Sequence, residues 1–549
     1  MREVARLRID QANVFYNCTI GLRVTDVDLL KTAGRFLNSG LARAVCFSDC
    51  KCLYVDNHAK TQLEWVRPEG RKWDPSWKVS FGPDVPHAVA SDLVFSIGLL
   101  FHERRIGGSE SGETTPYLRA ALPPIILQSE DLTLPLYAWV KVHSDGIVIL
   151  SFQLDATWDG IGEESWISTT VNLFQRYFDA VWVDALVQRL DAEQLLPHAF
   201  HDEMSVAGRR IGGGKTKKLL RKMRRKSEAF LSEALAKKGR EFEIGDERWV
   251  LHEVAGSEQQ EDWEASMDLC RSEYVNAVAG LIVSRSQREV SAVRDVLRWE
   301  GRPSVSLMRF DRQPASKDIL LAEFGPSMSR ILMRAGGIDD PPELPPDLRL
   351  FEDYCFHGNR AVLLWTWLRA DDAPDDAWED GTTLAALSEN QARAEHFEYH
   401  NMRLARACAI AGAPPSYEHL VEAYETLTLA EHAIHDSGQA GEVSDALVYL
   451  TSAAGTAGLV PSGKEKARWH LDELRYRTER QRARADRWIG FVFGLVGAAG
   501  LADLVLKPYL AARYPNLGSG TTGLVAFLLA ALAVVLLAVP LWFSSRRVS

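Results

Sequence analysis

The chain has 549 residues, of which 46% are hydrophobic and 25% charged, and its formal net charge is −11. This composition excludes a disordered chain, and the length predicts two or three folded units. The acidic balance argues against a protein that binds nucleic acid over its whole surface. Seven unevenly spaced cysteines do not suggest a disulfide framework, and the first ten residues, MREVARLRID, lack the apolar stretch of a signal peptide. We therefore expect a body that folds in the reducing cytoplasm.

Residues 1–203 are expected to form an N-terminal α/β domain. Alternation of apolar and polar residues predicts strands at VARLRI, AVCF, CLYV and WVKV, and AWVKV-HSDG-IVILSFQL predicts a hairpin. Helical periodicity predicts helices at 25–38 and 165–194. Three cysteines surround one probable turn but lack a clear fourth ligand, so we predict no metal site at Cys46, Cys50 and Cys52.

Residues 204–245 are expected to form a basic loop and helix. Ten of the eighteen residues in 209–226 are Lys or Arg, and three glycines at 212–214 precede the expected helix start. A basic run and exposed backbone N–H groups both suit phosphate, in a nucleotide, an oligonucleotide or lipid headgroups. A phosphate-binding loop of the GxxxxGK[ST] type is excluded, because arginine stands at 209 and no strand precedes it. The expected phosphate ligands are Arg209, Arg210, Lys215, Lys217, Lys218, Arg221, Lys222, Arg224 and Arg225.

That basic run has a plainer explanation, as a solvated helix face or as the partner of an acidic stretch. The acidic stretch, DDAPDDAWEDGTT, is the expected linker at 371–383. Between the two, residues 246–370 are expected to form a second α/β unit, with strands at RWVLHEV, SVSLMRF, ILLAEF and LRLFEDY. Its helices are expected at 260–300 and 326–335.

Residues 384–463 are expected to form a helical region, broken at GAPP. It carries His396, His400, His419, His432 and His435, and a spacing of i,i+4 can chelate zinc. Neither pair has a clear third ligand, so we predict no metal there. No nucleophile–base pair or paired-acid signature stands out along the chain, which predicts a protein that is not an enzyme, with no catalytic residues and no cofactor.

Residues 464–487 are expected to form a stalk helix. They contain nine Lys or Arg and neither proline nor glycine. A heptad seam runs through them with 4-3 spacing, which suggests contact between copies of the chain. A charged helix that only touches anionic lipid headgroups is the alternative. The seam residues are Ala467, Leu471, Leu474, Thr478, Gln481, Ala485 and Trp488.

Residues 488–549 are expected to form a two-helix transmembrane region. The stretch 488–506 has one charged residue in 19, and 521–543 has none in 23. Either stretch is long enough, at 1.5 Å per residue, to cross a hydrocarbon core of roughly 30 Å. Lysine and arginine crowd the residues before the first helix and are sparse in the connecting loop. The positive-inside rule therefore places both ends of the region in the cytoplasm and the loop outside.

The first apolar stretch carries the expected pore residues. Its small residues let helices approach closely, so we expect Gly490, Gly494 and Gly497 to support association between copies of the chain. Asp503 is the only charged residue in either stretch. It is expected to form a ring of carboxylates that selects cations, or else a local i,i+4 pair with Lys507.

This order of parts resembles the CorA-like membrane proteins, which have a cytoplasmic α/β body, a stalk helix, a pore-lining helix, a short outer loop and a second helix. The Gly-Met-Asn signature of that family is absent, and the corresponding stretch reads LKPYLAARYPNLGSG. Divergent CorA-like proteins also resemble membrane effectors of bacterial antiviral defence. The resemblance implies a mixed α/β body with two C-terminal transmembrane helices, in a bacterial inner membrane.

The expected function is an oligomeric ion channel whose cytoplasmic part senses a nucleotide or an oligonucleotide, in defence against phage. Its expected partners are the lipid bilayer, further copies of the chain, that ligand, and the cations that pass through the pore. One alternative is a CorA-like transporter of magnesium or another divalent cation. Another is a membrane-tethered binding or scaffold protein without transport.

Overall fold

The computed structural model divides into two compact units. The first comprises Met1–Ala413 and Glu422–Lys464, and the second comprises Pro414–Val421 and Glu465–Ser549. The structure describes residues 6–22, 24–55, 63–66, 79–106, 115–129, 132–187, 239–254, 267–285, 296–299, 301–369, 381–412, 417–436, 441–516 and 518–544.

One mixed sheet forms the framework of the first unit, with fourteen strands among the described residues. Its main path runs β13-β14-β12-β1-β7-β6-β5-β2-β3-β4, and β8, β9, β10 and β11 join at the sides. All described pairs are antiparallel except β12 with β14. The strands are β1 (Arg8–Leu22), β2 (Ala44–Phe47), β3 (Cys52–Val55), β4 (Leu63–Val66), β5 (Tyr117–Ser129), β6 (Leu132–His143), β7 (Ile147–Gly162), β8 (Ala180–Val183), β9 (Arg240–Ile244), β10 (Glu247–Glu253), β11 (Val296–Trp299), β12 (Pro303–Phe310), β13 (Tyr354–Gly358) and β14 (Leu363–Trp367).

The sheet joins the two segments in which the sequence predicts separate α/β units. β12 pairs along β1, with Val14 opposite Val305, and β11 pairs with the end of β1. The boundary expected between 1–203 and 246–370 therefore does not divide the sheet.

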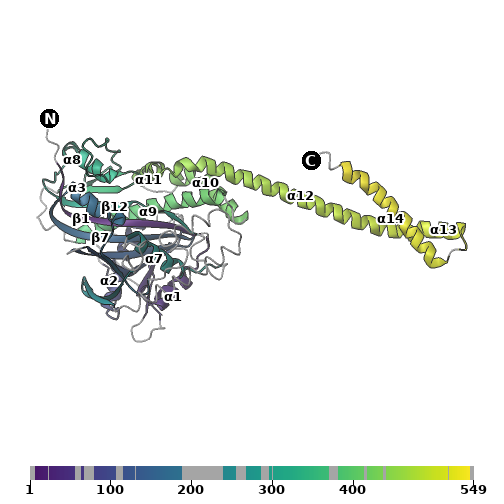
Figure 1. Ribbon diagram of the computed structural model, residues 1–549, viewed down its shortest axis with the longest axis horizontal. Helices are drawn as coiled ribbons and strands as arrows, with labels where there is room; N and C mark the ends of the chain where they lie inside the picture. Colours follow the sequence, from purple (N-terminus) through teal and green to yellow (C-terminus); the bar gives the residue numbers. More distant parts are fainter. Residues whose placement is uncertain are drawn as a thin grey trace. The chain divides into compact units, whose positions relative to one another are not determined.

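Helices cover both faces of this sheet in Figure 1. Alternate residues of β1 show why: Val14 and Tyr16 join the main hydrophobic core, whereas Asn17 turns to the opposite face and accepts a hydrogen bond from Gln391 of α9. The helices of the first unit are α1 (Leu29–Ser39), α2 (His87–Ile106), α3 (Glu163–Trp166), α7 (Met267–Ala279), α8 (Lys317–Met333), α9 (Gly381–Gly412) and α11 (Gly441–Ala453), and α10 (Tyr417–Asp436) belongs to both units.

Several local predictions are confirmed. The expected hairpin is β6 and β7, with Val142 opposite Val148. Strands lie at AVCF, CLYV, RWVLHEV and SVSLMRF, and the region beginning at 384 is helical as α9, α10 and α11. The mixed α/β class of the body is therefore confirmed.

Four local predictions are wrong. Within the range 260–300, expected to be helical, α7 ends at Ala279 and Val296–Trp299 forms the strand β11. ILLAEF belongs to α8, because Ser316 caps that helix by accepting from the N–H of Ile319 and buried residues recur at Leu320 and Phe324. LRLFED forms a loop before the strand β13, in which Leu350 is 75% exposed, and only Tyr354 of the predicted strand belongs to β13. The helix expected at 165–194 is short: η1 (Ile167–Val171) and η2 (Leu173–Gln175) follow α3, and β8 comes next.

The second unit consists mainly of the C-terminal helices. α12 (Val460–Leu501) continues unbroken from the stalk into the first apolar stretch, as the sequence predicts. It is followed by the π-helical turn η5 (Ala502–Leu506), by α13 (Lys507–Arg513) and by α14 (Ser519–Ser544). Among the described residues, one helical run is long and apolar enough to cross a membrane, judged by length and composition, at Ala457–Arg513; the apolar run described in α14, Ser519–Val534, is shorter.

Candidate functional site

Small residues join the first apolar stretch to α14. Ala498 and Ala502 pack against Ala526 and Ala530, and all four are buried. Gly494 extends this contact, since a Cβ atom added there would lie 3.1 Å from Cγ1 of Val534. Of the glycines expected to line a pore, Gly494 is thus used inside one chain, where it permits close approach of two helices.

The other glycines of the first apolar stretch face away from this contact. A Cβ atom added at Gly490, Gly497 or Gly500 would meet nothing within 4 Å among the described residues. On a helix these positions fall near Phe493 and Leu504, whose side chains are 71% and 80% exposed. α12 therefore carries an apolar face with three glycines that no described residue covers, which we call the glycine face.

Asp503 lies in the π-helical turn η5, immediately after α12. Its Oδ1 is 3.0 Å from Nζ of Lys507, and both side chains are substantially exposed. The i,i+4 pair that the sequence offers as one alternative is thus present within a single chain. A π-helical turn inserts one extra residue into a helix, and such turns are frequent at functional sites.

The residues of the heptad seam in the stalk differ in how far they are buried. Ala467 is buried and Leu471 and Leu474 are half-buried, whereas Thr478 and Gln481 are exposed. Exposed i,i+4 ion pairs such as Arg475–Glu479, at 3.2 Å, line the same helix. The expected phosphate ligands in 209–226 lie outside the described residues.

A buried ionic cluster, which the sequence does not predict, lies between the sheet and two helices of the first unit. Arg119 of β5 donates to both Glu103 of α2 and Glu395 of α9. Lys141 of β6 places its Nζ 2.7 Å from Oε1 of Glu103, and the hydroxyl of Tyr117 donates to Glu103 as well. Two acids and two bases balance one another, so the cluster is electrically neutral.

Electrostatics keep this cluster ionised. Burial by itself raises the pKa of Glu103, but Arg119 and Lys141 outweigh it and bring that pKa down to about 2. Burial lowers the pKa of Lys141, and Glu103 offsets that effect only in part. Because each charge has a partner, the cluster is suited to fixing α2 and α9 on the sheet rather than to proton transfer.

The histidines considered above as possible metal ligands lie on α9 and α10, and the cysteines lie in or between β2 and β3. His396 and His400 lie one turn apart on α9, with ring centroids 4.6 Å apart. Cys46 and Cys52 are opposite one another in the β2–β3 pair, and none of the seven cysteines is in a disulfide. The one group of three possible metal ligands in the described part of the chain lies elsewhere: ligand atoms of Asp347, Cys355 and His357 are all within 4.8 Å of one another.

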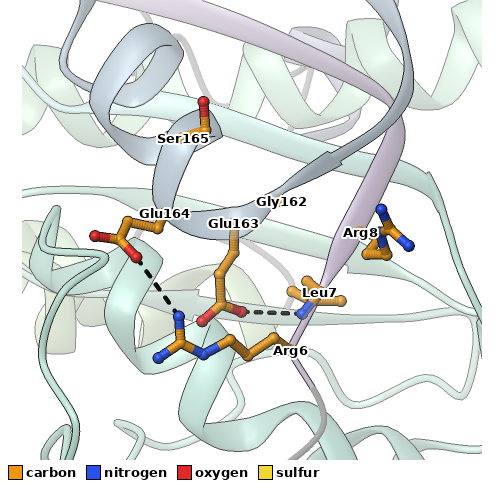
Figure 2. A pocket seen from close by; sticks show the side chains of 7 residues that line it. All are labelled: Arg6, Leu7, Arg8, Gly162, Glu163, Glu164 and Ser165. Carbon is orange, nitrogen blue, oxygen red and sulfur yellow. Dashed lines mark hydrogen bonds and ion pairs between the residues drawn. The ribbon is translucent and has the colours of Figure 1, made fainter.

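A surface pocket of about 540 Å³ lies where β7 leads into α3, beside the start of β1 (Figure 2). Both of its carboxylates are engaged. Glu163 accepts from the N–H of Leu7 at 3.0 Å and pairs with Arg330 at 2.7 Å, and Glu164 lies 3.5 Å from Arg6. These contacts tie the start of β1 to α3 and α8.

Comparison with protein-family models, with curated proteins and with solved structures finds no match to this chain.

Proposed function

We propose that this chain is one subunit of an oligomeric ion channel in a bacterial inner membrane. The glycine face of α12 is the observation that carries the proposal. Within the bilayer the surrounding lipid tails are as apolar as the side chains, so the hydrophobic effect does not drive helices together. Helices associate there where small residues allow close packing. Gly490, Gly497 and Gly500 offer such a surface, and no described residue of the same chain lies against it.

In this proposal both α12 and α14 cross the membrane. The stalk before the first apolar stretch carries nine Lys or Arg, whereas the connecting loop carries Lys507 and Arg513. This asymmetry favours cytoplasmic placement of the stalk and of the C-terminal end. Asp503 then lies near the outer end of the first span.

Assembly around α12 would gather the Asp503 carboxylates of several subunits. Rings of acidic side chains select cations. The Lys507 ammonium, at 3.0 Å, neutralises the carboxylate within one chain, so a selective ring requires this pair to loosen when the pore conducts. A charge within an apolar stretch is by default a candidate functional group.

The proposed ligand is a nucleotide or an oligonucleotide, bound by the basic residues of 209–226. Ten positive charges in eighteen residues favour a polyanion. Binding can open or close a pore only if the ligand has different affinities for the two states. The unbroken helix α12 supports such coupling, since it carries both stalk and glycine face. Defence against phage is the role that the resemblance to antiviral membrane effectors suggests.

Cation flux tests this function directly. The purified chain is placed in liposomes, and flux of K⁺ and of Mg²⁺ is measured with and without nucleotides and short oligonucleotides. We expect K⁺ flux that changes with ligand and loses this response when the basic residues of 209–226 become glutamine. Flux restricted to Mg²⁺ would instead favour a divalent-cation transporter.

A membrane anchor without transport is the second candidate. The self-contained Asp503–Lys507 pair favours it, because a neutralised charge needs no partner from another subunit. Absence of flux from protein shown to be inserted, together with a monomer in detergent, would establish the anchor and refute the channel.

A further inference from the structure

A group of three side chains with different ligand atoms lies at an edge of the sheet. β13 is the last strand on its side of the main path, and its residues alternate between the two faces. Cys355 and His357 therefore share one face, while Phe356 packs on the other. Asp347, from the loop before β13, completes the group, and one sulfur, one nitrogen and one oxygen ligand lie within 4.8 Å of one another.

One ring nitrogen of His357 contacts the backbone and the other has no hydrogen-bond partner among the described residues. Its Nδ1 lies 2.9 Å from the carbonyl oxygen of Pro345, which accepts the hydrogen if that nitrogen carries it. This tautomer leaves a lone pair on Nε2, and a backbone carbonyl on the far nitrogen is the usual arrangement for metal-binding histidines. The side chain is 1% exposed, and Nε2 has no hydrogen-bond partner among the described residues. Buried polar atoms without partners are rare, so this one calls for an occupant.

Asp347 is held in place from two sides. Its Oδ1 accepts from the N–H groups of Phe356, at 2.8 Å, and Arg349, at 3.0 Å. Its Oδ2 accepts from Nζ of Lys317 at 2.8 Å, and the same Nζ donates to the carbonyl oxygen of Arg349 at 2.8 Å. The ammonium group of Lys317 therefore occupies the position at Oδ2 of Asp347 that a metal cation would take. If a metal displaced it, Lys317 would still have the carbonyl oxygen of Arg349 as a hydrogen-bond acceptor.

Burial of these groups sets their protonation before any metal binds. Burial and then Asp347 raise the pKa of the Cys355 thiol to about 12. Burial lowers the pKa of His357, which keeps the imidazole neutral. Without a metal the Cys355 thiol is therefore protonated. A metal cation would reverse this, because a coordinated thiol is deprotonated.

We propose that Asp347, Cys355 and His357 bind one Zn²⁺ ion. A thiolate, an imidazole and a carboxylate are the ligand types that zinc accepts, and three protein ligands leave a fourth position for water. On binding, Sγ of Cys355 forms a bond to the metal and releases its proton to the solvent. Lys317 retains the carbonyl of Arg349. The ion would fasten the loop before β13 to the edge of the sheet.

Cobalt is a suitable probe, since Co²⁺ occupies zinc sites and gives a thiolate-to-metal charge-transfer band. The full chain in detergent is stripped with a chelator and titrated with Co²⁺. We expect about one equivalent per chain with that band, displaced by Zn²⁺, because the described residues contain one such group of ligands. Cys355→Ser should abolish the band, and His357→Gln should weaken binding at least severalfold.

Two further variants keep the test decisive. Cys50→Ser is the matched control, because it removes a cysteine from the group at 46–52 and should leave the band intact. Lys317→Met removes the competing ammonium and should tighten Co²⁺ binding, an effect that a purely structural lysine would not have. A folded, stripped chain without a thiolate–cobalt band, or a band lost in Cys50→Ser and kept in Cys355→Ser, overturns the proposal.

Discussion

The pair between Arg302 and Glu398 offers a sharp test of how the body is held together. Both side chains are 0% exposed, and Nε of Arg302 donates to Oε1 of Glu398 at 2.6 Å. The same guanidinium reaches the carbonyl oxygens of Asn359 and Leu450, at 3.4 and 3.3 Å. One side chain therefore connects the start of β12 with α9, with the turn before β14 and with α11.

Replacing Arg302 by methionine leaves Glu398 buried without its cation. Removal of one partner from a buried ion pair costs about 3–5 kcal/mol in the free energy of unfolding, whereas loss of an exposed pair costs about 0–1 kcal/mol. At roughly 2.1 cal/mol/K of unfolding entropy per residue, a unit of roughly 450 residues should lose about 3–5 °C in Tm.

The assay is thermal unfolding of the purified chain, followed by tryptophan fluorescence. Arg475→Met is the matched control, since it breaks an exposed pair in the stalk and should leave Tm nearly unchanged. The double variant Arg302→Met with Glu398→Met should recover part of the loss, because no unpaired charge remains. Equal Tm values for Arg302→Met and the control would refute this reasoning.

Three further predictions follow from the described residues. Glu273 is buried without a hydrogen-bond partner among the described residues, and burial raises its pKa to about 8. The folded chain thus keeps a proton that the unfolded chain loses above about pH 4.5, so stability falls by about 1.4 kcal/mol per pH unit up to about pH 8. Glu273→Gln should flatten this fall in denaturation series; an unchanged slope contradicts it. Gly497→Leu should reduce the oligomer seen by light scattering in detergent, and an unaltered mass would contradict the role of the glycine face. Asp503→Asn should reduce cation over anion selectivity severalfold in reversal-potential measurements, with equal selectivity as the contrary result.

Local sequence patterns correctly predicted the elements whose backbone hydrogen bonds join residues that are close in the sequence. The hairpin of β6 and β7 follows from alternation around a short turn, and the unbroken α12 follows from helix formers on both sides of Trp488. The prediction of a strand at ILLAEF was wrong, because a short apolar run fits a strand and a buried helix equally well. Its capping residue, Ser316, was the signal that could have decided between them.

Sequence reasoning missed the groups that come together only through the sheet. Arg119 and Glu395 are separated by 276 positions, so no spacing rule could join them. Arg119 and Lys141 do stand out as basic residues within apolar strands, which is a signal for buried partners. Cys355 and His357 have the i,i+2 spacing of one strand face, but Asp347 reaches them through a loop whose course the sequence does not reveal.

The close approach between Gly494 and Val534 has a consequence for natural variation of this chain. A Cβ atom at 494 would lie 3.1 Å from Cγ1 of Val534, a tight contact that the valine side chain can relieve only by shifting. Relatives that replace this glycine by alanine should therefore carry a smaller residue opposite it, so that the two positions change together. Gly490 and Gly497 have no such intrachain neighbour among the described residues. Correlated change between those two positions, neither of which has a close partner among the described residues, is the pattern expected of contact between chains.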